Sequence, residues 1–283
     1  MTAIYKSERG ARAVRERYLA FLDRWPVPSE RIVVPTREGD TFVLACGPKD
    51  APPPPLLLFH GSGANATMWL GDIAEWSKHF RCYAVDMIGE PGLSAPSRPK
   101  LDSDAHALWL DDVLAGLNIT RASIVGISLG GWLALDYATR RPGRVEKLAL
   151  LCPGGVGHQR SVVLFALPLM FFGTWGRRKL RQFVLGDAMR DTAGMKEMSE
   201  FASLVFVSFR PRRDKLPVFS DAKLRTLTMP VLTIVGARDV LLNSRATQRR
   251  LETNIADAQV RLLPRTGHLI RGETKTVLVF LMR

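Results

Sequence analysis

A serine, an aspartate and a histidine in this chain have the side-chain types and the order that nucleophilic catalysis requires. Residues 126–130 read Gly-Ile-Ser-Leu-Gly, a G-x-S-x-G pattern with Ser128 at its centre. A short apolar run, residues 122–127, precedes the serine, and residues 132–140 carry apolar side chains at helical spacing. This pattern is catalytic where a sharp strand-to-helix turn projects the hydroxyl above the edge of a sheet. We therefore interpret Ser128 as a nucleophile.

A serine hydroxyl is a weak nucleophile, so it needs a base to take its proton and a third group to orient that base. His268 follows the last predicted strand, in a loop that is expected to return to the catalytic edge of the sheet, and we expect it to be the base. His158 also follows Ser128, but we expect it to line the cleft or to face solvent. Asp239 stands just beyond the strand predicted at 231–235, where its carboxylate can accept the imidazole N–H and stabilise the imidazolium.

Two backbone N–H groups are expected to stabilise the oxyanion that forms when the serine attacks a carbonyl group. One belongs to Leu129, the residue after the nucleophile. The other is expected in the loop after the apolar strand at 56–59, where residues 60–63 read His-Gly-Ser-Gly, and we assign it to Ser62. His60 is interpreted as a structural residue that holds this loop by hydrogen bonding.

The size and composition of the chain predict one large α/β domain. It has 283 residues, of which 46% are hydrophobic and 24% are charged. Its three cysteines, Cys46, Cys82 and Cys152, are far apart and do not have the spacing of metal ligands. We expect them to be reduced core residues of a cytoplasmic protein. The first 25 residues contain no continuous apolar segment, so no secretory signal is predicted.

Apolar runs of strand length alternate with amphipathic segments along most of the chain, which predicts a mostly parallel sheet flanked by helices. Residues 153–225 break this alternation and are interpreted as a helical cap inserted at the carboxyl edge of a strand, where ligands bind in such sheets. The predicted core is therefore 1–152 together with 226–283. The predicted strands are 31–35, 41–46, 56–59, 81–86, 122–127, 145–151, 231–235 and 259–263, and the main predicted helices are 1–25, 102–117, 132–140, 244–253 and 273–282.

The net charge of +13 is concentrated in the predicted cap, because residues 154–225 hold 13 Lys and Arg against 6 Asp and Glu. No helix-turn-helix, zinc-finger or RNP-like motif accompanies this charge, so nucleic acid is not an expected partner. The apolar run at 162–172 is shorter than the roughly 20 residues of a membrane span. Basic runs follow at 177–181 and 210–213. We expect an apolar cap face over the cleft and a basic outer face; the alternative is a cap that contacts an anionic membrane or admits an acidic substrate.

Together these motifs resemble the α/β-hydrolase superfamily over residues 26–283 and, within it, bacterial serine carboxylesterases. The resemblance is carried by the residues named above and by the segment 86–94, whose first residue we interpret as holding its own loop through backbone hydrogen bonds. The chain departs from the superfamily pattern Asp-x-x-Gly-x-Gly-x-Ser in this segment, because Glu90 and Pro91 precede Gly92. This departure concerns the shape of the loop rather than the chemistry of the site.

The resemblance implies an α/β-hydrolase fold with a helical cap, and hydrolysis of a small-molecule ester through an acyl-enzyme without a metal or organic cofactor. An apolar cap favours an apolar acyl or aryl group in the substrate. Relatives with an aspartate nucleophile are set aside, because residue 128 is serine. Carbon–carbon bond hydrolases, thioesterases, peptidases and perhydrolases share the serine triad and stay open. A non-catalytic binding protein with this fold and a homodimer are also considered.

Overall fold

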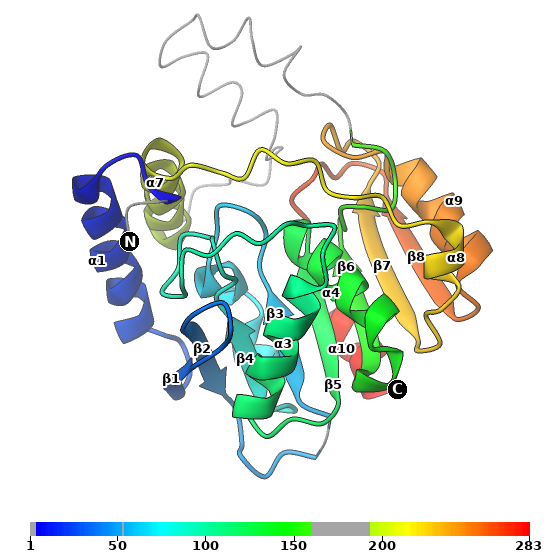
Figure 1. Ribbon diagram of the computed structural model, residues 1–283, viewed down its shortest axis with the longest axis horizontal. Helices are drawn as coiled ribbons and strands as arrows, with labels where there is room; N and C mark the ends of the chain where they lie inside the picture. The colour runs from blue at the N-terminus through cyan, green and yellow to red at the C-terminus, as the bar shows by residue number, and fades with distance from the viewer. Residues whose placement is uncertain (1–3, 53, 160–192) are drawn as a thin grey trace, which may run out of the picture.

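A computed structural model describes residues 4–52, 54–159 and 193–283 of the chain, and a single eight-stranded sheet lies at its centre (Figure 1). The strand order is β1-β2-β4-β3-β5-β6-β7-β8. β2 pairs antiparallel with β1 and β4, and every other pair is parallel. The strands are β1 (Ser29–Val34), β2 (Thr41–Cys46), β3 (Leu56–Phe59), β4 (Cys82–Val85), β5 (Ala122–Ile127), β6 (Val145–Leu151), β7 (Val231–Gly236) and β8 (Ala258–Leu263).

Both faces of the central strands are buried. In β3, Leu56 and Leu58 belong to one hydrophobic cluster, whereas Leu57 and Phe59 belong to the cluster on the opposite face. All four side chains are fully buried. Because successive side chains of a strand point to opposite faces, a strand covered on both sides must be apolar at every position, which explains the unbroken apolar runs in the sequence.

Helices cover the two faces of the sheet, with α3 and α4 in front of it in Figure 1 and α10 behind it. α1, α2 and α10 contribute to one hydrophobic cluster, and α3, α4 and α9 contribute to the other. The helices of the described residues are α1 (Glu8–Asp23), α2 (Ile73–Trp76), α3 (Ala105–Gly116), α4 (Leu129–Arg140), α7 (Ala193–Ser208), α8 (Asp221–Leu224), α9 (Ser244–Asn254) and α10 (Thr274–Met282), with 3-10 turns η2 (Ala66–Trp69) and η3 (Pro142–Arg144).

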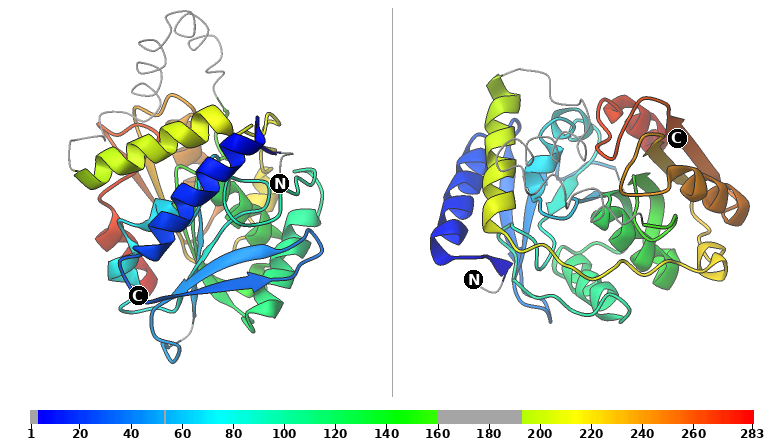
Figure 2. Two further views of the ribbon diagram at one scale, coloured as in Figure 1. Left: turned by 90° about the vertical axis from the view of Figure 1, so that its left-hand side faces the viewer. Right: turned by 90° about the horizontal axis from the view of Figure 1, so that it is seen from above.

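The N-terminal helix α1 packs against α7, the longer of the two described helices within the predicted insertion, and the two lie side by side in both views of Figure 2. The rings of Phe21 and Phe201 are 5.3 Å apart between centroids. Arg24 of α1 forms an ion pair with Glu197 of α7, with an N···O distance of 2.6 Å. The described part of this segment therefore packs on the N-terminal helix through α7.

The predicted α/β architecture with a mostly parallel sheet is confirmed. The N-terminal helix begins at Glu8 rather than at residue 1, because Ser7 is its N-cap and accepts the N–H of Gly10. After β3, the chain forms the 3-10 turn η2 and then α2, a single turn of α-helix.

Part of the predicted cap lies outside the described residues, including the apolar run at 162–172 and the basic run at 177–181. Within the described ranges, no helix has the length and apolar character needed to cross a membrane. The apolar residues 201–209 form the end of α7 and the residue after it; Phe201 and Phe209 are buried there and Phe206 is exposed.

The sheet brings the predicted catalytic residues to one edge. Ser128 follows β5, Asp239 lies three residues after β7 and His268 lies in the loop after β8. These strands run parallel within one sheet, so their carboxyl ends meet at the same edge.

Candidate active site

Ser128 occupies the turn between β5 and α4 with φ 53° and ψ −106°, a backbone conformation that side-chain-bearing residues rarely adopt. Hydrogen bonds hold the turn on both sides. The Ser128 N–H donates to the carbonyl of Leu151 at 2.9 Å, and the Ser128 carbonyl accepts the N–H of Trp132 at 2.9 Å. A Cβ on Gly126 would lie 2.5 Å from the carbonyl oxygen of Gly130, so the strand and the helix approach this closely only because residue 126 is glycine.

The structure brings the three residues of the predicted triad into hydrogen-bonding contact. Nε2 of His268 lies 3.0 Å from Oγ of Ser128. Nδ1 of the same imidazole lies 2.7 Å from Oδ2 of Asp239. One imidazole therefore connects the hydroxyl to the carboxylate, and each of its nitrogens has a separate partner. This is the geometry that a base needs in order to accept the serine proton while its second nitrogen is held.

Asp239 is held rigidly beneath the imidazole. Its side chain is 1% exposed, whereas that of His268 is 14% exposed. Oδ1 accepts the backbone N–H groups of Leu241 at 2.8 Å and Leu242 at 3.0 Å. These two bonds fix the plane of the carboxylate and leave Oδ2 for the imidazole. The imidazole is consequently the exposed end of the pair, next to the space from which a substrate would approach.

The loop after β3 passes beside the nucleophile. A Cβ on Gly61 would lie 3.8 Å from the Cβ of Ser128. The Gly61 N–H donates to Sδ of Met68 at 3.4 Å, whereas within the described ranges the N–H of Ser62 has no protein acceptor. Leu129 is the first residue of α4, and N–H groups in the first turn of a helix lack helical acceptors. Both predicted oxyanion donors therefore belong to segments that border Ser128.

His60 connects the loop after β3 to the loop after β4, as expected. It is fully buried, and its Nε2 accepts the N–H of Met87 at 3.0 Å. Nδ1 therefore carries the proton and donates to the carbonyl of Gly61 at 2.8 Å. Burial lowers the pKa of His60 to about 4, so the imidazole is neutral at physiological pH. This supports the interpretation of His60 as a structural residue.

Asp86 holds its own loop through backbone hydrogen bonds, as predicted, and it also reaches the N-terminal helix. Its carboxylate accepts the N–H groups of Ala66 at 3.0 Å and Leu93 at 2.8 Å. It also accepts the hydroxyl of Tyr18 at 2.9 Å. Burial raises the pKa of Asp86 to about 6, although all three hydrogen bonds lower it. The contact with Tyr18 was not predicted, because no pattern in the sequence pairs residues 68 positions apart.

Cys152 lies beside two residues of the triad and Glu90 lies against the loop after β3, and neither position was predicted from the sequence. All three cysteines are buried and free, as expected, but the thiol of Cys152 lies within 4.8 Å of the ligand atoms of Asp239 and His268. In the described part of the chain this is the one cluster with metal-ligating side chains, and two of its members are triad residues. The signal for Glu90 was its position in a segment that departs from the superfamily pattern.

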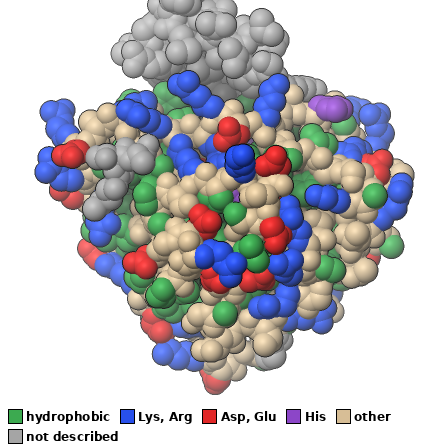
Figure 3. Space-filling model, viewed as in Figure 1, with side chains coloured by type: hydrophobic (Ala, Val, Ile, Leu, Met, Phe, Trp, Pro, Cys, Tyr) green, Lys and Arg blue, Asp and Glu red, His purple; other side chains and the backbone are tan. Residues whose placement is uncertain are grey.

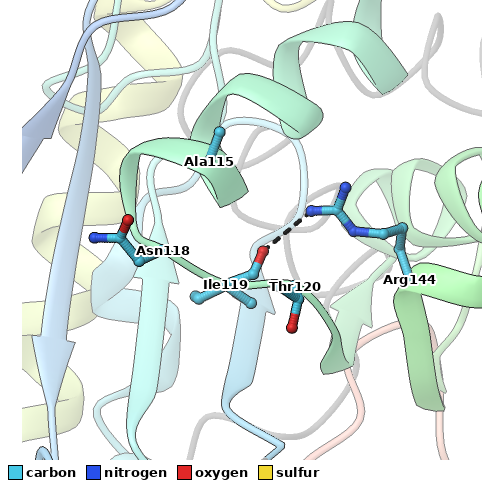
Figure 4. A pocket seen from close by; sticks show the side chains of 5 residues that line it. All are labelled: Ala115, Asn118, Ile119, Thr120 and Arg144. Carbon is cyan, nitrogen blue, oxygen red and sulfur yellow. Dashed lines mark hydrogen bonds between the residues drawn. The ribbon is translucent and has the colours of Figure 1, made fainter.

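Two hollows lie at opposite ends of the strands of the sheet. A hollow of about 490 Å³ is lined by residues such as Asn118 and Arg144, which precede β5 and β6 and therefore lie at the amino ends of the strands (Figure 4). A much smaller cavity, about 20 Å³, is lined by Leu129, Trp132 and Glu90 among others and lies beside the serine turn. The larger hollow thus lies at the opposite end of the strands from the triad, and the smaller one is lined by Leu129, the residue after Ser128.

The charge of the described surface is mixed. On the face shown in Figure 3, Lys and Arg side chains are interspersed with Asp and Glu rather than gathered in one patch. In the basic run at 210–213, Arg210 and Arg213 are exposed, but the side chain of Arg212 is only 10% exposed. Arg212 therefore points inward, which differs from the outer basic face expected for this run.

Known proteins resemble the chain over most of its length. Residues 56–276 match the model of a family described as the alpha/beta hydrolase family. The carboxylesterase YbfK of Bacillus subtilis is 32% identical over 263 residues, which cover 89% of this chain and 86% of the relative. An uncharacterized carboxylesterase, nap, of the same organism is 30% identical over 92% of this chain and 87% of its own length. A 2-hydroxy-6-oxo-2,4-heptadienoate hydrolase of Pseudomonas putida is 29% identical over 77% of this chain and 84% of its own length.

Solved structures agree with this assignment of the fold. The crystal structure of carboxylesterase CesB (YbfK) from Bacillus subtilis superposes with a TM-score of 0.81 over 96% of this chain and 98% of that chain, at 29% identity. The naproxen esterase of Bacillus subtilis superposes with a TM-score of 0.82 over 98% of this chain and 99% of that chain, at 28% identity.

Proposed function

The chain belongs to the alpha/beta hydrolase family, and on this premise we propose that it hydrolyses a carboxylic ester through an acyl-enzyme on Ser128. The observation that carries the proposal is the distance of 3.0 Å between Oγ of Ser128 and Nε2 of His268. A hydroxyl and an imidazole nitrogen at this separation can exchange a proton as the hydroxyl attacks a carbonyl.

The proposed reaction has two steps that use the same base. His268 takes the proton of Ser128 as Oγ bonds to the carbonyl carbon, and it then protonates the alcohol oxygen as the ester C–O bond breaks. Water next attacks the acyl-serine while His268 accepts one of its protons. Return of that proton to Oγ releases the acid and restores the hydroxyl of Ser128.

Charge in these steps develops at two places, and a fixed group lies at each. The imidazolium that forms on His268 is stabilised by the carboxylate of Asp239 at 2.7 Å. We assign the developing oxyanion to the backbone N–H groups of Ser62 and Leu129, which would hold it without side-chain rearrangement. Donors of this kind contribute about 10²–10³ in kcat each in serine hydrolases.

Ester cleavage is preferred over the alternatives because two relatives with about 30% identity are called carboxylesterases. Carbon–carbon bond hydrolysis is the second candidate, since the heptadienoate hydrolase is 29% identical over most of its length. An apolar acyl or aryl group in the substrate is part of the proposal because of the apolar segments in the sequence of the predicted cap.

The first test is the intact mass of the protein after reaction with a fluorophosphonate, followed by peptide mapping. We expect one adduct per chain, on Ser128, and none in Ser128→Ala or His268→Ala. His158→Ala is the matched control, because His158 is exposed and should leave labelling unchanged. An adduct elsewhere, or full labelling of Ser128→Ala, would contradict the proposal.

Substrate class is tested separately with a panel of p-nitrophenyl esters of increasing acyl length and with a dienol ketone. Turnover of esters, lost by at least about 10³-fold in Ser128→Ala, is the expected result. Turnover of the ketone without turnover of any ester would instead assign carbon–carbon bond cleavage to the same triad.

A further inference from the structure

A buried glutamate lies against the loop that carries the proposed oxyanion donor. Glu90 follows β4 and is only 2% exposed. Its Oε2 accepts the backbone N–H of Gly63 at 2.6 Å and lies 3.4 Å from the hydroxyl of Ser62. The carboxylate therefore contacts the two residues on either side of the Ser62–Gly63 peptide bond.

These contacts are suited to holding a backbone in place. A hydrogen bond from an N–H group to an ionised carboxylate is shorter and about twice as strong as one between neutral groups. Gly63 has φ 68°, so the chain turns sharply at this point, and the carboxylate satisfies the N–H group that the turn directs inward. On the other side, the Gly61 carbonyl is held by His60 at 2.8 Å. Ser62 is thus the residue between two anchored neighbours.

We propose that Glu90 is a positioning residue for ester cleavage: its carboxylate fixes the Ser62–Gly63 backbone so that the Ser62 N–H is held beside Ser128 as an oxyanion donor. The inference deepens the proposed function and rests on it. Glu90 itself would touch neither the substrate nor the reacting atoms, and it would act through the loop.

Two cationic side chains, Arg98 and Arg212, act on this carboxylate. Arg98, on the same loop, donates to the carbonyls of Gly89 at 3.0 Å and Arg210 at 2.6 Å. Arg212, from the segment after α7, lines the same small cavity as Glu90 and lowers its pKa through its positive charge. Two cationic side chains therefore favour the ionised form.

Two further titratable groups lie close by. His106 of α3 lines the small cavity with Glu90, and burial lowers its pKa to about 4, so it is neutral near pH 7. Tyr5, in the N-terminal segment, has a pKa raised to about 12, chiefly by burial and in part by Asp86 and Glu90. Neither group changes charge near pH 7. Asp86, at the start of the same loop, has a pKa of about 6 and titrates in Glu90→Gln as well, so the difference between the two pH profiles isolates Glu90.

Burial raises the pKa of Glu90 to about 7 despite the two arginines. Protonation converts the anionic acceptor into a neutral carboxyl group and weakens its bond to the N–H of Gly63. The rate should therefore fall by a limited step, about 3–10-fold, as the pH decreases through the pKa of Glu90.

The test uses the second-order rate of Ser128 phosphonylation by a fluorophosphonate between pH 5 and pH 9, because this reaction uses the oxyanion donors and needs no known substrate. In the wild-type protein, the pH profile of the rate should contain a step of about 3–10-fold centred near pH 7. In Glu90→Gln this step should be absent, and the rate at pH 8 should fall about 3–10-fold, mainly in the maximal rate rather than in the apparent affinity. The rate of Ser128 phosphonylation in Glu90→Ala should be lower still, by about 100-fold relative to the wild-type protein.

Glu146→Gln is the matched control, because Glu146 lies at the amino end of β6, in an ion pair with Arg121, and should leave the rate and its pH profile unchanged. A folded Glu90→Gln with the wild-type rate and pH profile would overturn the inference. If that variant does not fold, the wild-type profile decides, and a profile without a step near pH 7 overturns the inference. Failure of wild-type Ser128 to react at all would overturn the proposed function as well, whereas a reactive Ser128 with an unchanged Glu90→Gln overturns only the role of Glu90.

Discussion

Oδ2 of Asp239 lies 2.7 Å from Nδ1 of His268, while Oδ1 of the same carboxylate accepts two backbone N–H groups. The two oxygens thus have separate tasks, one in holding the loop after β7 and one in orienting the imidazole. Because the carboxylate can only accept, it requires the proton of a neutral imidazole to reside on Nδ1. Nε2 is then left as the acceptor toward Ser128.

Asp239→Asn should keep the fold and lose most of the activity. The amide oxygen can still accept the two backbone N–H groups, but the amide nitrogen would donate to Nδ1 and favour the tautomer with the proton on Nε2. We expect ester turnover to fall by about 10⁴-fold with little change in the melting temperature. Asp257→Asn, at an exposed aspartate, is the control. Loss of less than about tenfold would argue against Asp239 as the orienting residue.

Gly130→Ala should destabilise the protein although alanine is the better helix former. A Cβ at residue 130 would lie 2.2 Å from the carbonyl oxygen of Phe59 and 2.5 Å from that of His60, so backbone must move. We expect a loss of about 1–3 kcal/mol in the free energy of unfolding, measured by urea denaturation, together with slower labelling of Ser128. Gly143→Ala, where no atom lies within 4 Å of the added Cβ, should be neutral or stabilising by up to about 1 kcal/mol. Equal effects of the two substitutions would contradict this account.

Tyr18→Phe should destabilise the fold in a pH-dependent way. The Tyr18 hydroxyl donates to Asp86, whose pKa is raised to about 6 by burial, and this bond stabilises the ionised carboxylate. The loss should therefore be about 1.5–3 kcal/mol at pH 8 and about 1 kcal/mol at pH 5, where the carboxyl group is protonated. Tyr83→Phe is the control. Urea denaturation at the two pH values measures the difference, and a larger loss at pH 5 would have the wrong sign.

The burial of Asp86 also makes the stability of the folded protein depend on pH. Its folded-state pKa of about 6 lies above that of an unfolded aspartate, so the folded protein binds the proton more tightly. The contribution of Asp86 to stability is therefore most favourable below about pH 4 and is lost as the pH rises through 6. In Asp86→Asn, which does not titrate, this part of the pH dependence should disappear.

The three thiols should resist a disulfide reagent in the folded protein. All are buried and free, and burial raises the pKa of each, to about 11 for Cys46. Because the thiolate is the reactive form, reaction with Ellman's reagent at pH 8 should require unfolding. We expect no fast reaction before guanidinium is added and three thiols per chain afterwards. A fast-reacting thiol in the native protein would show that one of these sites opens readily.

Local sequence patterns predicted much of the fold. The apolar runs at 56–59 and 145–151 match β3 and β6 at both ends. A strand that is buried on both faces is apolar at nearly every position, so it can be recognised in the sequence without knowing which strands it pairs with. Ser128 and His268 were also accessible to sequence reasoning, since the serine pattern and the loop after the last strand locate them by order along the chain. The N-terminal helix was predicted, but its packing against α7 was not.

The sequence by itself determined which residue types stand at the ends of which strands, and therefore that a serine, an aspartate and a histidine would share one edge of a parallel sheet. Only the tertiary structure decided which distant side chains meet there. Tyr18 reaches Asp86, and Glu90 reaches Gly63 and faces Arg212, across separations along the chain that no local period encodes. Such pairs depend on how loops from different strands pack, and burial then sets the pKa of each carboxylate.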